Sequence, residues 1–144
     1  MITNISTLKN EIQTPDPAET AQLKAILGML AGKVYDKLGP GLSEAVYRRA
    51  LDIELRYMGI DVECAVEEPV YYDGYWIGKR KVDLLFGKSI LVVIKSAYSV
   101  DQSDLMAMQS HLKTFEVPLG ILINFGKEKP EFAEFSLADG EMDK

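Results

Sequence analysis

The fold is decided by two apolar runs joined by a three-residue break: Lys81-Val82-Asp83-Leu84-Leu85-Phe86, then Gly87-Lys88-Ser89, then Ile90-Leu91-Val92-Val93-Ile94-Lys95. Runs rich in Leu, Ile, Val and Phe around a break that contains glycine predict a β-hairpin. With the break as the loop, Asp83 lies opposite Val93, and Lys95 leaves the sheet on the same face as Val93. The stretch therefore predicts a carboxylate and a lysine close together on one face of a largely buried sheet.

The composition is that of one globular domain. The chain has 144 residues, of which 47% are hydrophobic and 26% charged. The formal net charge of −6 does not favour non-specific nucleic-acid binding, although it leaves room for a local basic groove. One cysteine and one histidine are too few for a structural zinc site. No run reaches the roughly 18 apolar residues of a membrane span, and residues 1–13 lack the pattern of a signal peptide. We therefore expect a cytoplasmic protein with no membrane partner.

The rest of the chain predicts helices around this hairpin. Residues 1–15 show no period and are expected to form a flexible tail, residues 16–138 one domain, and residues 139–144 a polar tail. Apolar residues at three- and four-residue steps predict helices over 17–38, 43–58 and 101–115. Further strands are expected at 60–66, 69–72, 75–78, 119–125 and 132–137. This order predicts an α/β (α+β) fold with a central mixed sheet flanked by helices on both faces.

A separate phrase carries a family resemblance. Gly41, Glu44 and Tyr47 match the pattern that names the GxxExxY family, and Leu38-Gly39-Pro40 precedes them as is usual there. The phrases at 70–72 and 120–126 and the placement of Asp83 and Lys95 also resemble that family, from about residue 23 to about residue 137. The family is grouped with the PD-(D/E)xK nucleases, so the resemblance implies a restriction-endonuclease-like core.

The resemblance also implies a metal-dependent chemistry. In such nucleases an Asp, a second acidic residue and a Lys at x-K spacing hold a divalent metal and the attacking water. Carried onto this chain, the catalytic residues are Glu44, Asp83 and Lys95, and the metal ligands are Glu44 and Asp83, for Mg²⁺ or Mn²⁺. Lys95 would orient water or stabilise the transition state.

Three positions depart from that pattern. Val93 stands where the second hairpin carboxylate belongs, and valine cannot bind a metal. Ala107 and His111 stand where Gln and Tyr are typical, and Gln109 is turned about 200° round the helix from position 107. The departures fall on polar positions that would face the site, whereas the scaffold phrases persist. We therefore expect a nuclease-like protein with weakened or lost activity that acts in nucleic-acid or protein binding; the alternative is an active Mg/Mn-dependent nuclease using Glu44, Asp83 and Lys95.

Several interpretations stay open at the level of the sequence. A buried Asp83 needs a partner, which is either a metal or Lys95. The aromatic residues at 71, 72, 75 and 76 are expected to pack in the core or hairpin, with base stacking as the alternative. Lys79-Arg80-Lys81 reads as a solvated strand end or as a phosphate contact, and His111 as a surface or packing residue rather than an acid–base group. DNA, RNA and a second copy of the chain are all open as partners.

Overall fold

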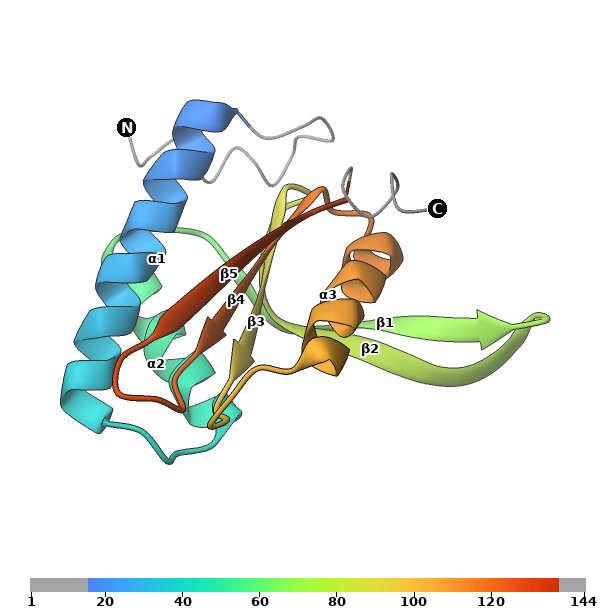
Figure 1. Cartoon of the computed structure of the whole chain (residues 1–144). Coiled ribbons are helices and arrows are strands. Elements are labelled where there is room, and N and C mark those ends of the chain that lie inside the picture. Colours follow the sequence, from blue (N-terminus) through green and yellow to red (C-terminus); the bar gives the residue numbers. More distant parts are fainter. Residues whose placement is uncertain (1–15, 138–144) are drawn as a thin grey trace.

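The computed structural model describes residues 16–137, and Figure 1 shows their arrangement. Three helices and five strands follow one another in the order α1 Pro17–Leu38, α2 Glu44–Tyr57, β1 Glu63–Tyr72, β2 Tyr75–Phe86, β3 Ile90–Lys95, α3 Gln102–Phe115, β4 Leu119–Asn124 and β5 Glu131–Ser136. The predicted tails, residues 1–15 and 139–144, lie outside the described residues. Within residues 16–137, none of the helices combines the length and the apolarity that a bilayer crossing requires.

The strands form a single mixed sheet in the order β1-β2-β3-β4-β5. Neighbouring strands are antiparallel except for β3 and β4, which run parallel and place Lys95 beside Asn124. A parallel pair requires a crossover connection, and α3 supplies it. The mixed sheet expected from the sequence is confirmed.

The helices cover both faces of the sheet, as predicted. Helices α1 and α2 lie on one face, where Leu23, Leu27 and Leu51 pack against inward-facing residues of β2, β3 and β4. Helix α3 lies on the other face, where Met108 and Leu112 pack against Leu91 and Leu122. Residues alternate between the two cores along β3, so the strand is buried on both sides and reads as a continuous apolar run.

The helix bounds agree closely with the sequence pattern, and the local chemistry explains why. The side chain of Asp16 accepts a hydrogen bond from the backbone N–H of Ala18 at the start of α1. At the start of α3, Asp101 and Asp104 form a reciprocal capping box. Ser43 occupies the N-cap position of α2 but forms no side-chain capping bond.

The first two strands are longer than predicted. The short strands expected at 60–66, 69–72, 75–78 and 81–86 are continuous in two long strands, β1 and β2, joined by Asp73-Gly74. Both turn residues have positive φ angles, 53° and 82°, which is the geometry of a type I′ turn. A type I′ turn matches the twist of the strands it joins. Strands β1 and β2 therefore form one long two-stranded ribbon, where the sequence indicated four short strands.

A local break in this ribbon positions the site. The ladder between β2 and β3 extends from Phe86 to Leu84, in the predicted register, and no further pairs follow. Opposite Asp83 on the other side, Ala65 has a φ of 54°, and residues 65 and 83 are absent from the regular β1–β2 pairing. Strand β2 therefore leaves β3 at Asp83, and the polar side chain at this position has room to bond across the gap.

Candidate functional site

The candidate site is a cleft of about 590 Å³ between the start of α2 and the point where β2 leaves β3. Its polar residues are Glu44 and Arg48 from α2, Lys81 and Asp83 from β2, and Lys95 from β3, and Val93 lies among them. The three residues predicted to form a site, Glu44, Asp83 and Lys95, are thus brought to one cleft. Ala107, Gln109 and His111 are not among the residues that line it.

The loop before α2 is fixed by Tyr47, which aims Glu44 at the cleft. The Tyr47 ring is fully buried and stacks on Phe125, with ring centroids 4.3 Å apart. Its hydroxyl donates to the carbonyl of Gly39 and accepts from the backbone N–H of Leu42. Because both ends of the 39–42 loop are bonded to one rigid side chain, α2 begins at a defined place, and its first residue is Glu44.

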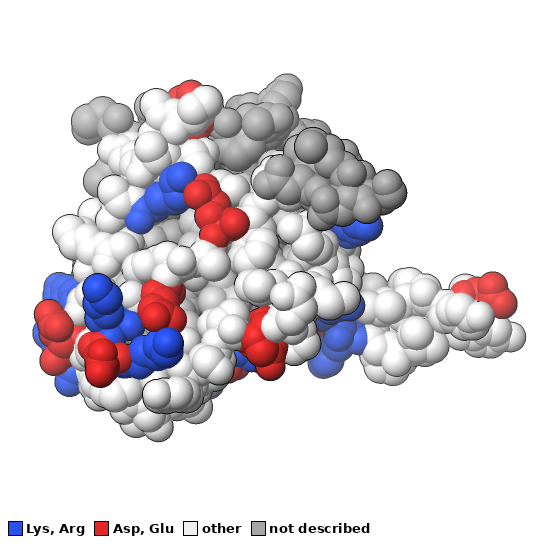
Figure 2. Space-filling model, in the orientation of Figure 1, with Lys and Arg blue, Asp and Glu red and all other residues white. Residues whose placement is uncertain are grey.

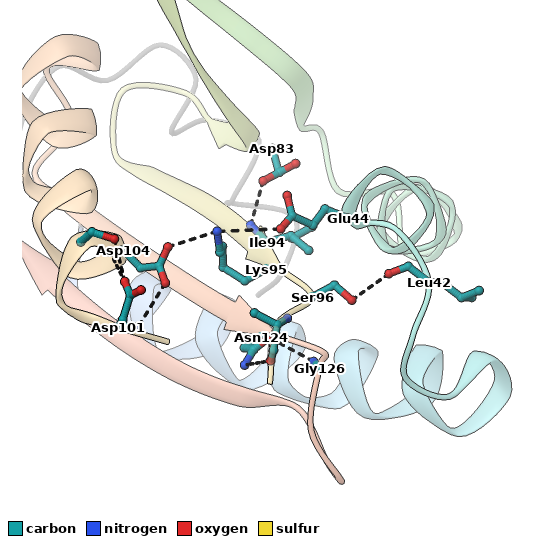
Figure 3. A network of polar contacts seen from close by, with 12 residues as sticks. Leu42, Glu44, Asp83, Ile94, Lys95, Ser96, Asp101, Asp104, Asn124 and Gly126 are labelled. Carbon is teal, nitrogen blue, oxygen red and sulfur yellow. Dashed lines mark hydrogen bonds and ion pairs between the residues drawn. The ribbon is translucent and has the colours of Figure 1, made fainter. Parts of the chain in front are cut away.

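Asp83 is held by groups that belong to the protein itself. One carboxylate oxygen accepts from the backbone N–H of Ile94 at 2.7 Å, which satisfies a strand donor that β2 leaves unpaired (Figure 3). The other oxygen is 3.2 Å from Nη1 of Arg48, and the two side chains are only 12% and 11% exposed. The partners of Asp83 within the described residues are therefore Arg48 and the backbone of Ile94, whereas Lys95 pairs with other acids. The assignment of Asp83 as a metal ligand stays a prediction.

Lys95 pairs with acids on both sides of the cleft. Its Nζ is 3.1 Å from Oδ1 of Asp104 on α3 and 3.9 Å from Oε2 of Glu44 (Figure 3). The pKa of Lys95 is raised, first by the hydrogen bond to Asp104, while burial opposes the rise and the charges of Asp104 and Glu44 add to it. Lys95 is thus a firmly protonated cation in the cleft.

The loops at the carboxyl ends of β3 and β4 are fastened to each other. Asn124 is fully buried; its amide oxygen accepts from the backbone N–H of Ala97 and Gly126, and its amide nitrogen donates to the carbonyl of Ala97. The hydroxyl of Ser96 donates to the carbonyl of Leu42 at 2.7 Å (Figure 3). These bonds fix the chain directly after Lys95 against the loop that precedes Glu44.

The donors of this cleft do not fit a divalent metal as they are arranged. Both oxygens of Asp83 are engaged, and Glu44 and Asp104 share the ammonium group of Lys95. Within residues 16–137, no group of three or more acidic, histidine or cysteine side chains is placed to hold a metal ion. Mg²⁺ needs hard oxygen ligands and, here, would lie beside a guanidinium and an ammonium group. The role expected for Glu44 and Asp83 as metal ligands is therefore not supported by the geometry.

Sequence reasoning missed two residues of this network, Arg48 and Asp104. Arg48 lies four residues after Glu44, so both side chains project from the same face of α2, and this spacing was the available signal. Asp104 carries no such signal, because its position in the capping box already accounts for an acid there. Its contact with Lys95 depends on how α3 lies against the sheet.

Cys64 and His111 lie outside the cleft, and the pKa of each is shifted by burial. Burial, with help from nearby Asp52, raises the pKa of the Cys64 thiol to about 11, so little of it is the reactive thiolate near neutral pH. Burial and the charge of Arg80 lower the pKa of His111. The Nδ1 atom of His111 is buried and has no hydrogen-bond partner among the described residues.

Comparison with solved structures places this fold. The chain is similar to the protein SSO0001, with a TM-score of 0.50 and 20% identity over 88% of this chain, which spans 64% of the length of SSO0001. An alkaline exonuclease from Laribacter hongkongensis gives a TM-score of 0.44 and 12% identity over 96% of this chain and 79% of the exonuclease. At sequence identities this low, the similarity is one of fold alone. No curated protein matches the sequence.

The family comparison covers most of the chain. Residues 21–135 match the model of the PD-(D/E)XK nuclease superfamily, and this range extends from within α1 to within β5 and includes all residues that line the cleft. The predicted nuclease-like core, a mixed sheet flanked by helices, is confirmed by this match and by the observed topology. The chain belongs to the PD-(D/E)XK nuclease superfamily.

Proposed function

We propose that this protein binds nucleic acid at the cleft and does not hydrolyse it. The observation that carries the proposal is the Arg48–Asp83 ion pair, beside a valine at position 93. Nucleases of the superfamily generally use divalent metals, and the carboxylate expected to hold one here is neutralised by a guanidinium. Arg48 therefore takes the place of a metal cation beside Asp83. The protein keeps the nuclease scaffold but lacks a full set of metal ligands for catalysis.

The remaining cations of the cleft suit a phosphate group. Lys81 is exposed, and among the ion pairs formed by residues 16–137 none involves it. Lys95 is a protonated cation whose side chain is 29% exposed, so an incoming anion can share it with Asp104. Two ammonium groups in a partly enclosed cleft attract the phosphate backbone through a local field, even on an acidic protein.

Three finer assignments belong to the same proposal. Gly41, Glu44 and Tyr47 support a place in the GxxExxY group of the superfamily, because Tyr47 orders the loop that presents Glu44. We assign residues 16–138 to one domain and a cytoplasmic location to the protein, both on the sequence pattern. DNA and RNA stay equal candidates at the cleft itself, since the contacts named above are to phosphate.

The test measures binding and cleavage together. Labelled single- and double-stranded DNA and RNA are titrated with the native protein in EDTA, Mg²⁺ and Mn²⁺. We expect binding in all three conditions and no cleavage in any. Lys95→Ala weakens binding severalfold at low salt, because a phosphate contact is lost, whereas Lys88→Ala, at the exposed hairpin turn, does not.

Variants at position 93 distinguish a binding protein that has lost a catalytic carboxylate from a nuclease that is active without it. Cleavage by Val93→Glu when it also carries Arg48→Gln, with a silent native protein, supports the proposal, because this variant removes the internal cation and supplies the missing carboxylate. Cleavage by the native protein that Lys95→Ala abolishes overturns the proposal in favour of an active nuclease using Glu44, Asp83 and Lys95. Absence of any binding also overturns it.

A further inference from the structure

The end of the β1–β2 ribbon, which we call the arm and define as residues 67–81, carries several exposed large hydrophobic side chains. Val66 and Val82 at its root pack against the core beneath α3. Beyond them, β2 pairs only with β1, and Figure 1 shows the ribbon extending away from the body of the protein. A two-stranded ribbon with nothing against it is only marginally stable in water, so its composition calls for an explanation.

Aromatic side chains cover the distal half of the arm. Tyr71 and Trp76 form one cross-strand pair and Tyr72 and Tyr75 the next. They are between 61% and 75% exposed, so they lie on the hairpin, one of the two expected positions, and outside the core. Asp73 is the single charged residue of positions 69–78, and Figure 2 shows the arm as a mostly uncharged surface with acidic atoms at its tip. Large aromatic patches exposed in this way mark interaction sites.

The arm is joined directly to the proposed phosphate site. Lys79, Arg80 and Lys81 form its root on β2, and Lys81 also lines the cleft. Lys79 pairs with Glu67, whereas Arg80 and Lys81 form no ion pair with any other described residue. Lys81 lies five positions after Trp76, which is about 17 Å along an extended strand. A basic stretch thus leads from the cleft to the aromatic side chains.

We propose that the arm is a stacking platform for single-stranded nucleic acid whose phosphates occupy the cleft and the arm's basic root. This inference rests on the proposed function. Proteins that bind single strands combine a basic path for the backbone with aromatic rings on which the bases stack. Stacking uses the face of a base, which a duplex keeps inside its own stack, so the arm selects single strands. It does not read the 2′-hydroxyl, so single-stranded DNA and RNA bind alike.

The position of Trp76 makes the inference directly measurable. It is the only tryptophan of the chain, so its fluorescence reports the arm without an added probe. Titration of the native protein with oligo-dT and oligo-U is expected to quench this fluorescence with the same midpoint as binding measured by anisotropy of a labelled oligonucleotide. Duplex DNA is expected to compete poorly.

Variants of the arm give the second readout. Trp76→Ala and Tyr75→Ala are each expected to weaken single-strand binding about tenfold, and Trp76→Phe to retain most of it. Tyr57→Ala is the matched control, because Tyr57 is 79% exposed at the far end of α2. Circular dichroism establishes that each variant is folded.

The outcomes separate this inference from the proposed function. Single-strand binding that neither quenches Trp76 nor responds to Trp76→Ala overturns the arm inference and leaves binding at the cleft intact. Equal competition by duplex DNA also overturns it. A native dimer that Trp76→Ala dissociates, with oligonucleotide binding unchanged, makes a second copy the occupant of the arm and overturns the inference. Absence of binding to any nucleic acid overturns the proposed function and this inference with it.

Discussion

At the residue scale, the chemistry of the cleft depends on how the charge of Asp83 is neutralised. A carboxylate that is 12% exposed loses most of its hydration, and only a charged or hydrogen-bonded partner offsets that cost. Arg48 and the backbone N–H of Ile94 together supply both. A guanidinium stays protonated at every physiological pH, so Arg48 always neutralises the charge of Asp83.

The first prediction concerns this pair. Arg48→Met is expected to lower the free energy of unfolding by about 3 kcal/mol, because it leaves Asp83 buried without its countercharge. Arg56→Met on the same helix is the control: Arg56 pairs with Asp52 but is 73% exposed, so less than about 1 kcal/mol is expected. Chemical denaturation measures both. Equal effects of the two variants contradict the role given to Arg48.

The second prediction concerns His111, whose pKa in the folded protein is lowered from 6.5 by burial and by Arg80. In the unfolded chain the pKa returns to about 6.5, so the unfolded state binds more protons just below that pH. Above about pH 6.5 the lowered pKa of His111 therefore costs no stability. The free energy of unfolding falls as the pH decreases from there towards the lowered pKa.

Comparison with His111→Gln isolates this effect. Between pH 8 and pH 5.5 the native protein is expected to lose more unfolding free energy than the variant, since all carboxylates are common to both proteins. Parallel curves for the two proteins would show that His111 has an ordinary pKa in the folded state.

At the element scale, the site depends on the joint between the ends of β3 and β4. Gly126 follows β4, and a Cβ atom at this position would lie 2.1 Å from the carbonyl oxygen of Ala97. That approach brings both backbones within reach of the side-chain amide of Asn124. The joint is therefore closed by backbone contact that only glycine permits.

The third prediction follows from this contact. Gly126→Ala is expected to lower the free energy of unfolding by about 2–3 kcal/mol, because backbone rather than a flexible side chain must move. Gly28→Ala, inside α1 with nothing within 4 Å of the added Cβ, is the matched control and is expected to stabilise by about 0.5–1 kcal/mol. Thermal or chemical denaturation of both variants decides the point. A neutral Gly126→Ala would contradict the contact.

At the scale of the whole molecule, the sequence predicted the architecture well and the chemistry of its centre poorly. Hydrophobic periodicity and capping residues are local, so the three helices and the mixed sheet followed from the sequence. The hairpin register also followed, because the three-residue loop Gly87-Lys88-Ser89 sets which residues of β2 and β3 lie opposite each other. The convergence of Glu44, Asp83 and Lys95 was predictable from the family resemblance.

What the sequence did not reveal depends on tertiary placement. The choice of Arg48 rather than Lys95 as the partner of Asp83 depends on how α2 lies against the sheet. The aromatic residues of the arm have a hydrophobic pattern that fits a core strand, and only the length of the ribbon beyond α3 leaves them exposed. Neither distinction is encoded in local spacing.

The most direct test of the central claim is calorimetric titration of Mn²⁺ into the native protein and into Asp83→Asn. We expect no Mn²⁺ binding that depends on Asp83, because Arg48 already pairs with this carboxylate. The double variant Arg48→Gln/Val93→Glu is the positive control; it removes the internal cation, supplies the missing acid, and is expected to bind Mn²⁺. Stoichiometric Mn²⁺ binding by the native protein that Asp83→Asn abolishes would contradict the claim that the centre carries its own cation in place of a metal.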